Sequence, residues 1–450
     1  MRIAFIGDTH YCIPREYGGP PVGPGDLLDH RRYTPMTDEV LRPLLDQVRQ
    51  TKPDLVISSG DFVEGGLGGF PEEARREMNE GLAYFTQLGI PFLIARGTHD
   101  APQLFAELVV PAMSQSTGGE AGHTYLRHDL GNCTFLILDY QCYAIGNPQD
   151  RWFEAQLSAA TDAGRRIFVV AHAPVYLWGR HFFGEPALMR RLDLLLSTYS
   201  VDAYLCGHTH NQAVSFHARQ TEHGWLQLMG SSVGYPKMPP VGLDAVHSLA
   251  DFGPSNTLLW GILEDSAPGL FVIDVNPDGM EICWQSVSGE KRRFAVEATR
   301  TIPDAPETTH NGTRLPISDD DFCQIKSAVL GVFSYGQGGD TTQIALNGIS
   351  LGPAPTNGSY AARRFMPLPS LALCTIGRSN TVTASTTEPA EYAIGSFCLE
   401  VTLLDGRILR SLVAPEILVS GSRWNEFPGA RTLVPCAPGR AHDVTLNFVG

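Results

Sequence analysis

Five short apolar runs, each ending in residue types that bind metal ions, constrain this chain more than any other feature. The run at 203–206 is typical of a buried strand and leads directly into the sequence GHTH at 207–210. At the spacing of His208 and His210, both imidazole rings can point to one side of an extended segment. Imidazole and carboxylate side chains together suit zinc, iron, nickel and manganese. A lone pair of histidines is more often a surface feature, so the other four runs decide the interpretation.

The other four runs are also followed by Asp or His residues. In chain order they end in Asp8 with His10, in Asp61, in His99 and in His172. In open α/β sheets, ligands bind outside the carboxyl ends of the strands, where all of these residues are expected to lie. Core histidines or solvated carboxylates would not be expected at five such places in one chain. We therefore interpret the set as a single metal site.

Segments with a helical spacing of apolar residues separate several of these runs. The spacing predicts four helices, which begin near Thr37, Pro71 and Pro186 or end at Gly164. Pro43 lies inside the first of them and would cost stability there. The alternation of strands and helices predicts an α/β domain over residues 1–295.

The character of the sequence changes in its last third. Residues 296–317 are rich in Pro, Thr and Asp, which is typical of a linker. Residues 318–450 contain strand-like pieces separated by Gly, Asn and Pro turns, without a long helical period. Asn347 and Gly348 are typical of a two-residue hairpin turn. We expect an all-β sandwich there, without clustered residues of ligand type.

Composition narrows the class of protein further. The chain has 450 residues and a formal net charge of −15, which argues against an extended nucleic-acid surface because such surfaces need clustered Lys and Arg. No stretch of about 18 apolar residues is present, so no membrane span is expected. A strand-like segment begins at Arg2 and leaves no room for a signal peptide, which favours a cytoplasmic location. The nine scattered cysteines contain no CxxC pair, as expected of reduced thiols.

The polar residues after the five runs form an ordered series of motifs. They read DTH from Asp8, GD from Gly60, GTHD from Gly97, AH at His172 and GHTH from Gly207. This series resembles the calcineurin-like metallophosphoesterase family, whose pattern is DxH, GD, GNH[DE], a lone His and GHxH. As an ordered set over the first ~295 residues the resemblance is specific. It implies an α/β fold with a two-sheet sandwich flanked by helices, to which the C-terminal all-β sandwich is added.

The resemblance also implies a binuclear metal site. The ligands would be Asp8, His10 and His210 for one ion and His172 and His208 for the other, with Asp61 bridging both. Two ions ~3.5–4 Å apart clamp the attacking and leaving oxygens of an in-line displacement and lower the pKa of a shared water. This set of two aspartates and four histidines suits Mn, Fe, Zn, Co or Ni, so it leaves the metal open.

The catalytic histidine of the family corresponds to His99. It would lie beside the leaving group, where it could stabilise phosphate charge or donate a proton. Asp100 would orient the ring of His99 and favour its protonated form.

One position departs from the family pattern. The family has Asn where this chain has Thr98, and the carbonyl of that Asn normally completes the coordination of the second metal. A Thr hydroxyl is also a neutral oxygen ligand, but it is shorter and a poorer donor. The exchange is either tolerated, with water filling the gap, or it weakens the second site and changes the chemistry.

The function implied by the resemblance is metal-dependent hydrolysis of a small anionic phosphomonoester or phosphodiester. Two alternatives stay open: another reaction at the same site, marked by Thr98, or a catalytically weak metal-bound binding protein. Retention of His99 and Asp100 favours chemistry, because a binding protein needs no proton donor. The C-terminal module could be a spacer, a substrate cover or the interface of a homo-oligomer.

Several other residues are weaker candidates. Arg96 could hold a substrate phosphate, although a structural role is the more common one for an arginine. Cys12 could touch the site, and Cys206 suits core packing. The remaining candidates for contacts with an anionic substrate lie in predicted loops: Arg31, Arg32, Arg180, His181 and Lys237.

Overall fold

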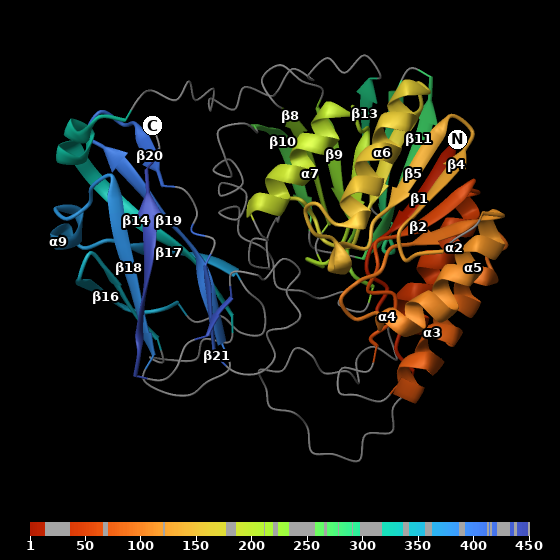
Figure 1. Cartoon of the computed structure of the whole chain (residues 1–450), viewed down its shortest axis with the longest axis horizontal. Coiled ribbons are helices and arrows are strands. Elements are labelled where there is room, and N and C mark those ends of the chain that lie inside the picture. Colours follow the sequence, from red (N-terminus) through yellow and green to blue (C-terminus); the bar gives the residue numbers. More distant parts are fainter. Residues whose placement is uncertain are drawn as a thin grey trace.

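The structure is a computed structural model of the chain. It describes residues 1–13, 37–65, 71–119, 122–176, 186–210, 212–218, 224–233, 257–264, 268–277, 279–289, 291–297, 317–335, 342–355, 362–386, 392–411, 414, 416–420, 433–435 and 439–448. The N-terminal part is a pair of stacked sheets with helices outside them, and the C-terminal part is made mostly of strands (Figure 1). The α/β fold with an additional all-β module is thereby confirmed.

The first N-terminal sheet has six strands in the order β13-β12-β11-β1-β2-β3. Strands β1, β2 and β3 run parallel, and β11 adds to β1 in the antiparallel direction. Their bounds are β1 (Arg2–Ile6), β2 (Leu55–Ser58), β3 (Phe92–Ile94), β11 (Gly269–Asn276), β12 (Gly279–Ser286) and β13 (Lys291–Glu297). Apart from the exposed Arg2 at the start of β1, the parallel strands are buried along their whole length and mostly apolar, as expected of strands covered on both faces.

The second sheet has seven strands in the order β10-β8-β9-β7-β6-β5-β4. Strands β5, β6, β7 and β9 run parallel. Their bounds are β4 (Leu126–Leu130), β5 (Cys133–Ile137), β6 (Arg166–Val170), β7 (Ala203–Cys206), β8 (Gln212–Ala218), β9 (Trp225–Met229) and β10 (Thr257–Glu264). One apolar core joins the inner faces of both sheets, with Phe5 and Phe271 from the first and Phe135 and Phe168 from the second.

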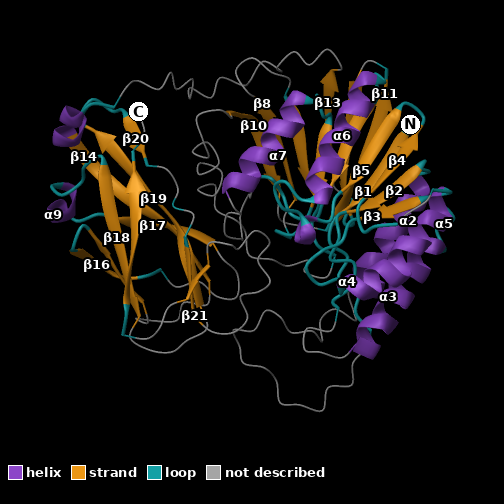
Figure 2. Ribbon diagram, in the orientation of Figure 1, coloured by secondary structure: helices purple, strands orange, loops and turns teal. Residues whose placement is uncertain are grey.

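Helices cover the outer faces of the two sheets (Figure 2). The helix α2 (Arg42–Thr51) packs its apolar face on the first sheet, and α6 (Pro148–Asp162) and α7 (Pro186–Thr198) pack on the second. The other helical segments are η2 (Thr37–Leu41), α3 (Pro71–Thr86), α4 (Pro102–Leu104), η3 (Phe105–Val109), α5 (Val110–Thr117) and η4 (Tyr140–Cys142). The loss of helix stability expected for Pro43 is avoided. The segment η2 precedes α2, so Pro43 lies in the first turn of α2, where its missing N–H needs no partner.

The C-terminal part contains two further sheets, with strand orders β17-β14-β19-β21-β22 and β16-β15-β18-β23, and with β20 pairing to β19. A separate apolar core includes Leu330, Ile344 and Leu446 from strands of both sheets. The elements are η6 (Asp319–Gln324), β14 (Ile325–Tyr335), β15 (Thr342–Leu346), β16 (Ile349–Pro353), β17 (Ala362–Pro367), α9 (Ser370–Leu373), β18 (Ser379–Thr386), β19 (Tyr392–Leu403), β20 (Ile408–Arg410), β21 (Ile417–Ser420), β22 (Leu433–Pro435) and β23 (Ala441–Asn447). The hairpin turn predicted at Asn347-Gly348 is confirmed, since both residues have positive φ between the paired strands β15 and β16.

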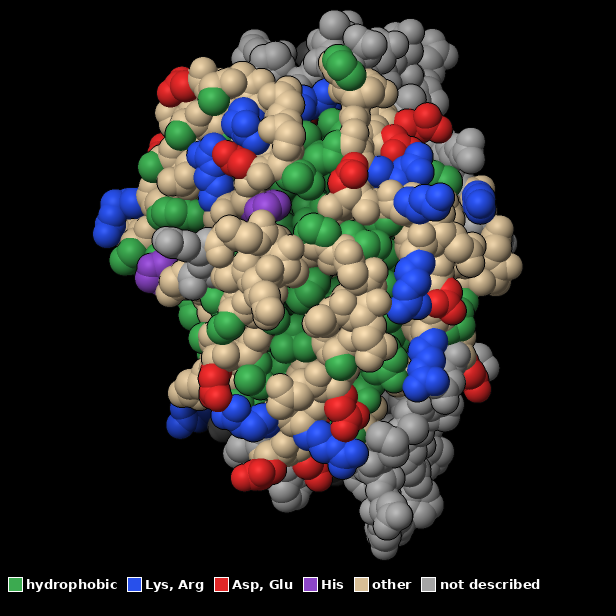
Figure 3. All heavy atoms as spheres, turned by 90° about the vertical axis from the view of Figure 1, so that its right-hand side faces the viewer, with side chains coloured by type: hydrophobic (Ala, Val, Ile, Leu, Met, Phe, Trp, Pro, Cys, Tyr) green, Lys and Arg blue, Asp and Glu red, His purple; other side chains and the backbone are tan. Residues whose placement is uncertain are grey.

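The boundary between the two parts stays a prediction. Val296 and Glu297, expected at the start of the linker, belong to β13, whereas the rest of the predicted linker up to residue 316 lies outside the described residues. None of the helices in the described ranges is both long and apolar enough to cross a bilayer. On the face that carries α2, α3 and α5, the Lys and Arg side chains are interspersed with Asp and Glu and form no continuous basic surface (Figure 3).

Candidate metal centre

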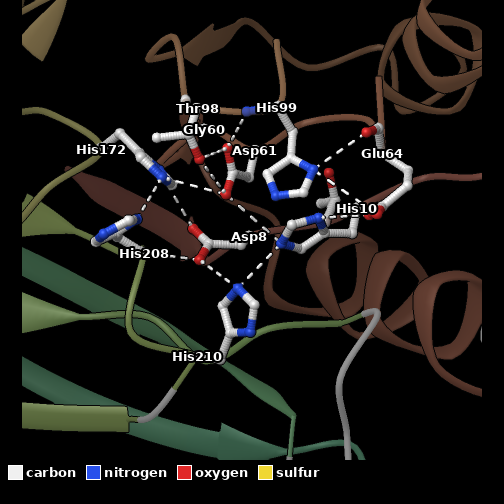
Figure 4. Close-up of polar contacts among 12 residues, drawn as sticks. Asp8, His10, Gly60, Asp61, Glu64, Thr98, His99, His172, His208 and His210 are labelled. Carbon is white, nitrogen blue, oxygen red and sulfur yellow. Dashed lines mark hydrogen bonds and ion pairs between the residues drawn. The ribbon is translucent and has the colours of Figure 1, made fainter. Parts of the chain in front are cut away.

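The loops that follow β1, β2, β3, β6 and β7 meet at one end of the two-sheet sandwich and bring the predicted ligands together (Figure 4). Every one of the six candidate Asp and His ligands is at most 8% exposed, and Asp8 and His172 are fully buried. Their ligand atoms fall into two groups that share Asp61: Asp8, His10, Asp61 and His210, and Asp61, His172 and His208.

The backbone around these side chains is unusual. His10, Asp61, His208 and His210 all have positive φ, between 40° and 72°. Non-glycine residues adopt this left-handed conformation rarely, and where they do the surrounding structure must hold them there. Four such residues in one cluster indicate that the chain accepts local backbone strain in order to aim these side chains.

Two motif glycines allow loops from different strands to pass against the central carboxylates. A Cβ on Gly97 would lie 2.0 Å from the amide nitrogen and 2.3 Å from a carboxylate oxygen of Asp61. A Cβ on Gly207 would lie 2.0 Å from Oδ1 of Asp8 and 2.3 Å from Oγ of Ser59. Both positions therefore require glycine for close approach.

The first group surrounds Asp8. Oδ2 of Asp8 lies 3.7 Å from Nε2 of His210, and Nε2 of His10 lies 3.1 Å from Nε2 of His210 and 3.6 Å from Oδ2 of Asp61. Asp8 is held from both sides, because its Oδ1 accepts a hydrogen bond from Oγ of Ser59 (2.9 Å) and its Oδ2 accepts one from the backbone N–H of His208 (2.7 Å).

The second group lies on the other side of Asp61. Nε2 of His172 is 3.2 Å from Oδ2 of Asp61 and 3.1 Å from Nδ1 of His208. In both groups, ring nitrogens of neighbouring histidines face one another beside a carboxylate. Such an arrangement of lone pairs around common points is the donor pattern of a cation site, so the residues fit two metal ions of the Mn, Fe, Zn, Co or Ni kind.

Hydrogen bonds at the far ring nitrogens set the tautomers of two histidines. Nδ1 of His172 lies 3.2 Å from the carbonyl oxygen of Ser59, and Nδ1 of His10 lies 3.0 Å from Oε2 of Glu64. Because a carbonyl and a carboxylate only accept, each Nδ1 donates its proton, so that each Nε2 would be the nitrogen that turns a lone pair toward a bound ion. Partners of this kind orient metal-binding histidines in many proteins.

Thr98 lies beside the shared carboxylate. Its hydroxyl is 3.1 Å from Oδ1 and 3.3 Å from Oδ2 of Asp61, to which it donates a hydrogen bond. The same hydroxyl oxygen keeps lone pairs that could serve a metal ion. The role of Thr98 as a metal ligand stays a prediction.

The role expected for Asp100 stays a prediction. Its carboxylate accepts hydrogen bonds from the backbone N–H groups of Phe62, Val63 and Gly97, at 2.9 to 3.2 Å, and thus joins two loops. These contacts fix the turn that carries His99.

Glu64 lies next to the ring of His99. Nδ1 of His99 lies 3.1 Å from the backbone carbonyl oxygen of Glu64 and 3.7 Å from its Oε1. The side chain of Glu64 is fully buried and contacts both His10 and His99 (Figure 4). It lies on the side of His10 that faces away from Asp8. Sequence reasoning missed Glu64 because it belongs to no apolar run; the available signal was an acidic residue three positions after the predicted bridging Asp61.

Burial and charge act in opposite directions on the central carboxylates. Burial raises the pKa of Asp8 to about 6, against the effect of His172. Burial would also raise the pKa of Asp61, but the neighbouring histidines, His172 first, hold it well below its ordinary value. Burial lowers the pKa of His172, yet Asp61 outweighs this and raises it to about 9. Asp61 is thus the more strongly anionic of the two carboxylates at the centre.

The weaker candidates are placed as follows. Arg96 is buried and forms a two-pronged ion pair with Asp139, so it is a structural arginine and not a substrate contact. Cys206 is fully buried in the core under α6 and α7, as expected, and Sγ of Cys12 faces the carbonyl of Ile13. Five candidates lie outside the described residues: Arg31, Arg32, Arg180, His181 and Lys237.

Asp and His side chains converge at the carboxyl ends of the parallel strands of the two-sheet α/β sandwich, which is the arrangement expected of metallophosphoesterases. Residues 1–212 match the family described as calcineurin-like phosphoesterase. The resemblance seen in the motifs is thereby confirmed, and the chain is classed as a hydrolase of phosphoester bonds.

Two curated relatives and one solved structure are similar to parts of the chain. Tartrate-resistant acid phosphatase type 5 of Mus musculus is 28% identical over 320 residues, which cover 64% of this chain and 88% of the relative. Serine/threonine-protein phosphatase CPPED1 of Mus musculus is 25% identical over 177 residues, covering 36% of this chain and 55% of the relative. Among solved structures, a dimetal phosphatase from Danio rerio is 14% identical with a TM-score of 0.43, covering 65% of this chain and 98% of that one.

Proposed function

We propose that the protein hydrolyses a small phosphomonoester or phosphodiester at a binuclear metal centre. The observation that supports this most strongly is the pair of buried ligand groups that share Asp61. Asp8, His10 and His210 would hold one ion, and His172, His208 and Thr98 the other. When bound, the ions would supply a hydroxide near neutral pH and neutralise charge on the phosphoryl oxygens.

Hydrogen bonds within the chain would hold the metal ligands in place before substrate binds. Asp61 has two oxygens and can serve both ions, and its burial keeps water from competing for them. Ser59 and the backbone of His208 fix Asp8, while Glu64 fixes the ring of His10. Side chains held in this way do not need to reorganise during the reaction, and such preorganisation is usually the largest source of rate enhancement.

His99 would serve the leaving group. Its backbone N–H donates to Oδ1 of Asp61 (2.8 Å), which anchors the residue at the edge of the centre, and its ring is 15% exposed, so that a substrate can reach it. Since Nδ1 faces Glu64, a proton for the leaving oxygen would come from Nε2. The nearby carboxylate of Glu64 stabilises a positive charge on the ring.

The finer points of the function belong to the same proposal. Divalent Mn, Fe, Zn, Co or Ni would fill the site, and the substrate would be a small phosphoester without a nucleic-acid scaffold. We place the protein in the cytoplasm, with the C-terminal module as a candidate contact between copies of the chain.

Hydrolysis by the metal-loaded protein tests the proposal. We would strip the protein with a chelator, reload it with Mn²⁺, and measure turnover of phenyl phosphate, p-nitrophenyl phosphate and bis(p-nitrophenyl) phosphate. Turnover of one ester class, dependent on added metal, is the expected result. Binding of two ions without turnover of any phosphoester would contradict the proposal and favour the binding-protein alternative.

His99→Ala sharpens this test. The variant should keep its metals and lose about 10²–10⁴-fold in turnover of phenyl phosphate, whose poor leaving group needs a proton. The loss with p-nitrophenyl phosphate should be smaller, because that leaving group departs without help. Equal losses for both esters would rule out proton donation and leave His99 a role in charge stabilisation alone.

A further inference from the structure

Arg96 forms a buried ion pair that spans the two sheets of the catalytic domain. It follows β3 in the first sheet, and Asp139 follows β5 in the second. The guanidinium donates from Nε to Oδ2 of Asp139 (2.9 Å) and from an Nη to its Oδ1 (2.8 Å). Arg96 is 5% exposed and Asp139 is 1% exposed, so water does not compete for this two-pronged contact.

Asp139 is itself rigidly held. Its carboxylate accepts a hydrogen bond from Oγ1 of Thr124 (2.5 Å). Its backbone N–H donates to the side-chain carbonyl of Gln149 (2.8 Å), and its backbone carbonyl accepts from the amide of the same side chain (3.0 Å). The second sheet and α6 therefore provide a fixed point for the guanidinium.

Arg96, the other member of the ion pair, belongs to the loop that carries His99. Arg96 begins the sequence RGTHD, and a second Nη donates to the backbone carbonyl of Asp100 (3.4 Å), so the guanidinium closes over the turn that carries Thr98 and His99. Inside the turn, Gly97 and Asp100 are joined by a hydrogen bond, and His99 is tied through its backbone to Asp61. The turn is thus attached to the first sheet through Asp61 and to the second sheet through Arg96.

We infer that Arg96, through its ion pair with Asp139, is a positioning residue that sets the place of His99 relative to the metal centre. The inference rests on the proposed function, in which His99 serves the leaving group. Within the described residues, the side-chain hydrogen bonds of Arg96 go to Asp139, Asp100 and Cys142, none of which is a candidate metal ligand. Arg96 acts by holding the turn against the second sheet. Lysine cannot replace it fully, because an ammonium group cannot form the two parallel bonds to Asp139.

Displacement of a catalytic group by about 1 Å can lower turnover about 10²-fold. Loss of Arg96 should therefore reproduce the effect of His99→Ala in kind: a large loss for phenyl phosphate and a smaller one for p-nitrophenyl phosphate. A purely structural ion pair would lower the unfolding temperature without changing this dependence on the leaving group.

The chain offers a matched control for the ion pair. Arg166 at the start of β6 makes a partly buried ion pair with Asp202, with Nε to Oδ1 at 2.8 Å, at the opposite end of that strand from His172. Arg166→Met should cost stability as Arg96→Met does, but it should leave the position of His99 unchanged.

The experiment is a double-mutant cycle in the Mn²⁺-loaded full chain. Wild type, Arg96→Met, His99→Ala and the double variant are compared in turnover of both aryl phosphates, in affinity for inorganic phosphate by calorimetry, and in metal content. Arg96→Lys, which keeps the charge, and Arg166→Met complete the set. We expect Arg96→Met to bind two ions, to lose about 10²-fold with phenyl phosphate, and to cause no further loss when His99 is already Ala.

Additive losses in the double variant, or an equal loss in Arg166→Met, would overturn the inference while leaving the proposed function intact. If Arg96→Met does not fold, Arg96→Lys carries the same comparison in the same cycle. If the wild type hydrolyses neither ester, the proposed function is wrong, and the cycle is then judged on the affinity for inorganic phosphate. Equal weakening of phosphate binding in both single variants and in the double variant supports the positioning role. Additive weakening of phosphate binding overturns it.

Discussion

Asp61 is the residue that both candidate ligand groups share. We predict that Asp61→Ala abolishes binding of both ions, because each group then loses its common oxygen ligand. Metal analysis of the purified variant should show loss of the ions, with the fold retained by circular dichroism.

Asp150→Ala is a suitable control for this prediction. Asp150 is also a buried aspartate, 3% exposed, but it contacts Tyr143 and Arg191 away from the metal ligands. The control should keep both ions. Two ions per chain in Asp61→Ala would show that the bridging assignment is incorrect.

We expect Thr98 to decide how tightly the second ion is held. Its hydroxyl already donates to Asp61, and it reaches less far than an asparagine carbonyl would. We predict that the metal-free protein binds two ions in two calorimetric steps, that Thr98→Asn tightens the weaker step, and that Thr98→Val weakens it further. A single tight step for two ions in the wild type would contradict the prediction.

The substitution also bears on the kind of chemistry. At low metal concentration Thr98→Asn should raise the rate of ester hydrolysis, and this gain should shrink at saturating metal. Tighter metal binding combined with slower turnover of the natural substrate would mean that Thr98 serves the chemistry itself. A reaction other than phosphoester hydrolysis would then be the better proposal.

At the scale of elements, the apolar runs and the residues directly after them could be predicted from the sequence. The reason is that a buried parallel strand is apolar throughout and its carboxyl end is where a sheet binds ligands, so both signals are local. Glu64 and the partner of Arg96 could not be predicted in this way. Their roles arise from contacts between loops 35 and 43 residues apart in the chain, which no periodicity reports.

Strand β8 carries a buried histidine that lies outside the metal centre. The ring of His217 stacks against both Tyr176 (4.4 Å between ring centroids) and Trp225 (4.8 Å), and its Nε2 lies 2.7 Å from Oγ of Ser215. Burial lowers the pKa of His217 from 6.5 to about 3. The fold therefore keeps this imidazole neutral where the unfolded chain would protonate it.

This neutral ring predicts a pH dependence of stability. Between pH 6.5 and about 3 the unfolded chain binds one more proton at His217 than the folded chain, so the free energy of unfolding falls as the pH falls through this window. The contribution is about 1.4 kcal/mol per pH unit and vanishes above the unfolded pKa. Urea unfolding of the metal-free protein at pH 4.5 to 7.5 should show a shallower slope for His217→Phe than for the wild type. Parallel curves for the two proteins would contradict the prediction.

At the scale of the whole molecule, the C-terminal sandwich meets the catalytic domain through an apolar contact. The core beneath α6 and α7 includes Ala393 of β19 and Val419 of β21, which pair with each other across their strands. Ala393 is fully buried and Val419 is 7% exposed. This contact argues against a freely moving spacer and makes the sandwich part of the support of the second sheet.

We predict that Val419→Asp loosens the second sheet as well as the sandwich, because an unpaired carboxylate would face an apolar core. Losing the burial of one valine alone costs about 1.5–3 kcal/mol, and the buried charge adds to this cost. Hydrogen exchange followed by mass spectrometry should show faster exchange in α7 and β9, whose residues belong to the same core. Leu404→Asp is the control, since Leu404 is 69% exposed after β19 and its replacement should leave both elements unchanged. If Val419→Asp increases hydrogen exchange only within β14 to β23, the sandwich is an energetically separate module that does not support the second sheet. Its role would then be to contact the substrate or a second copy of the chain.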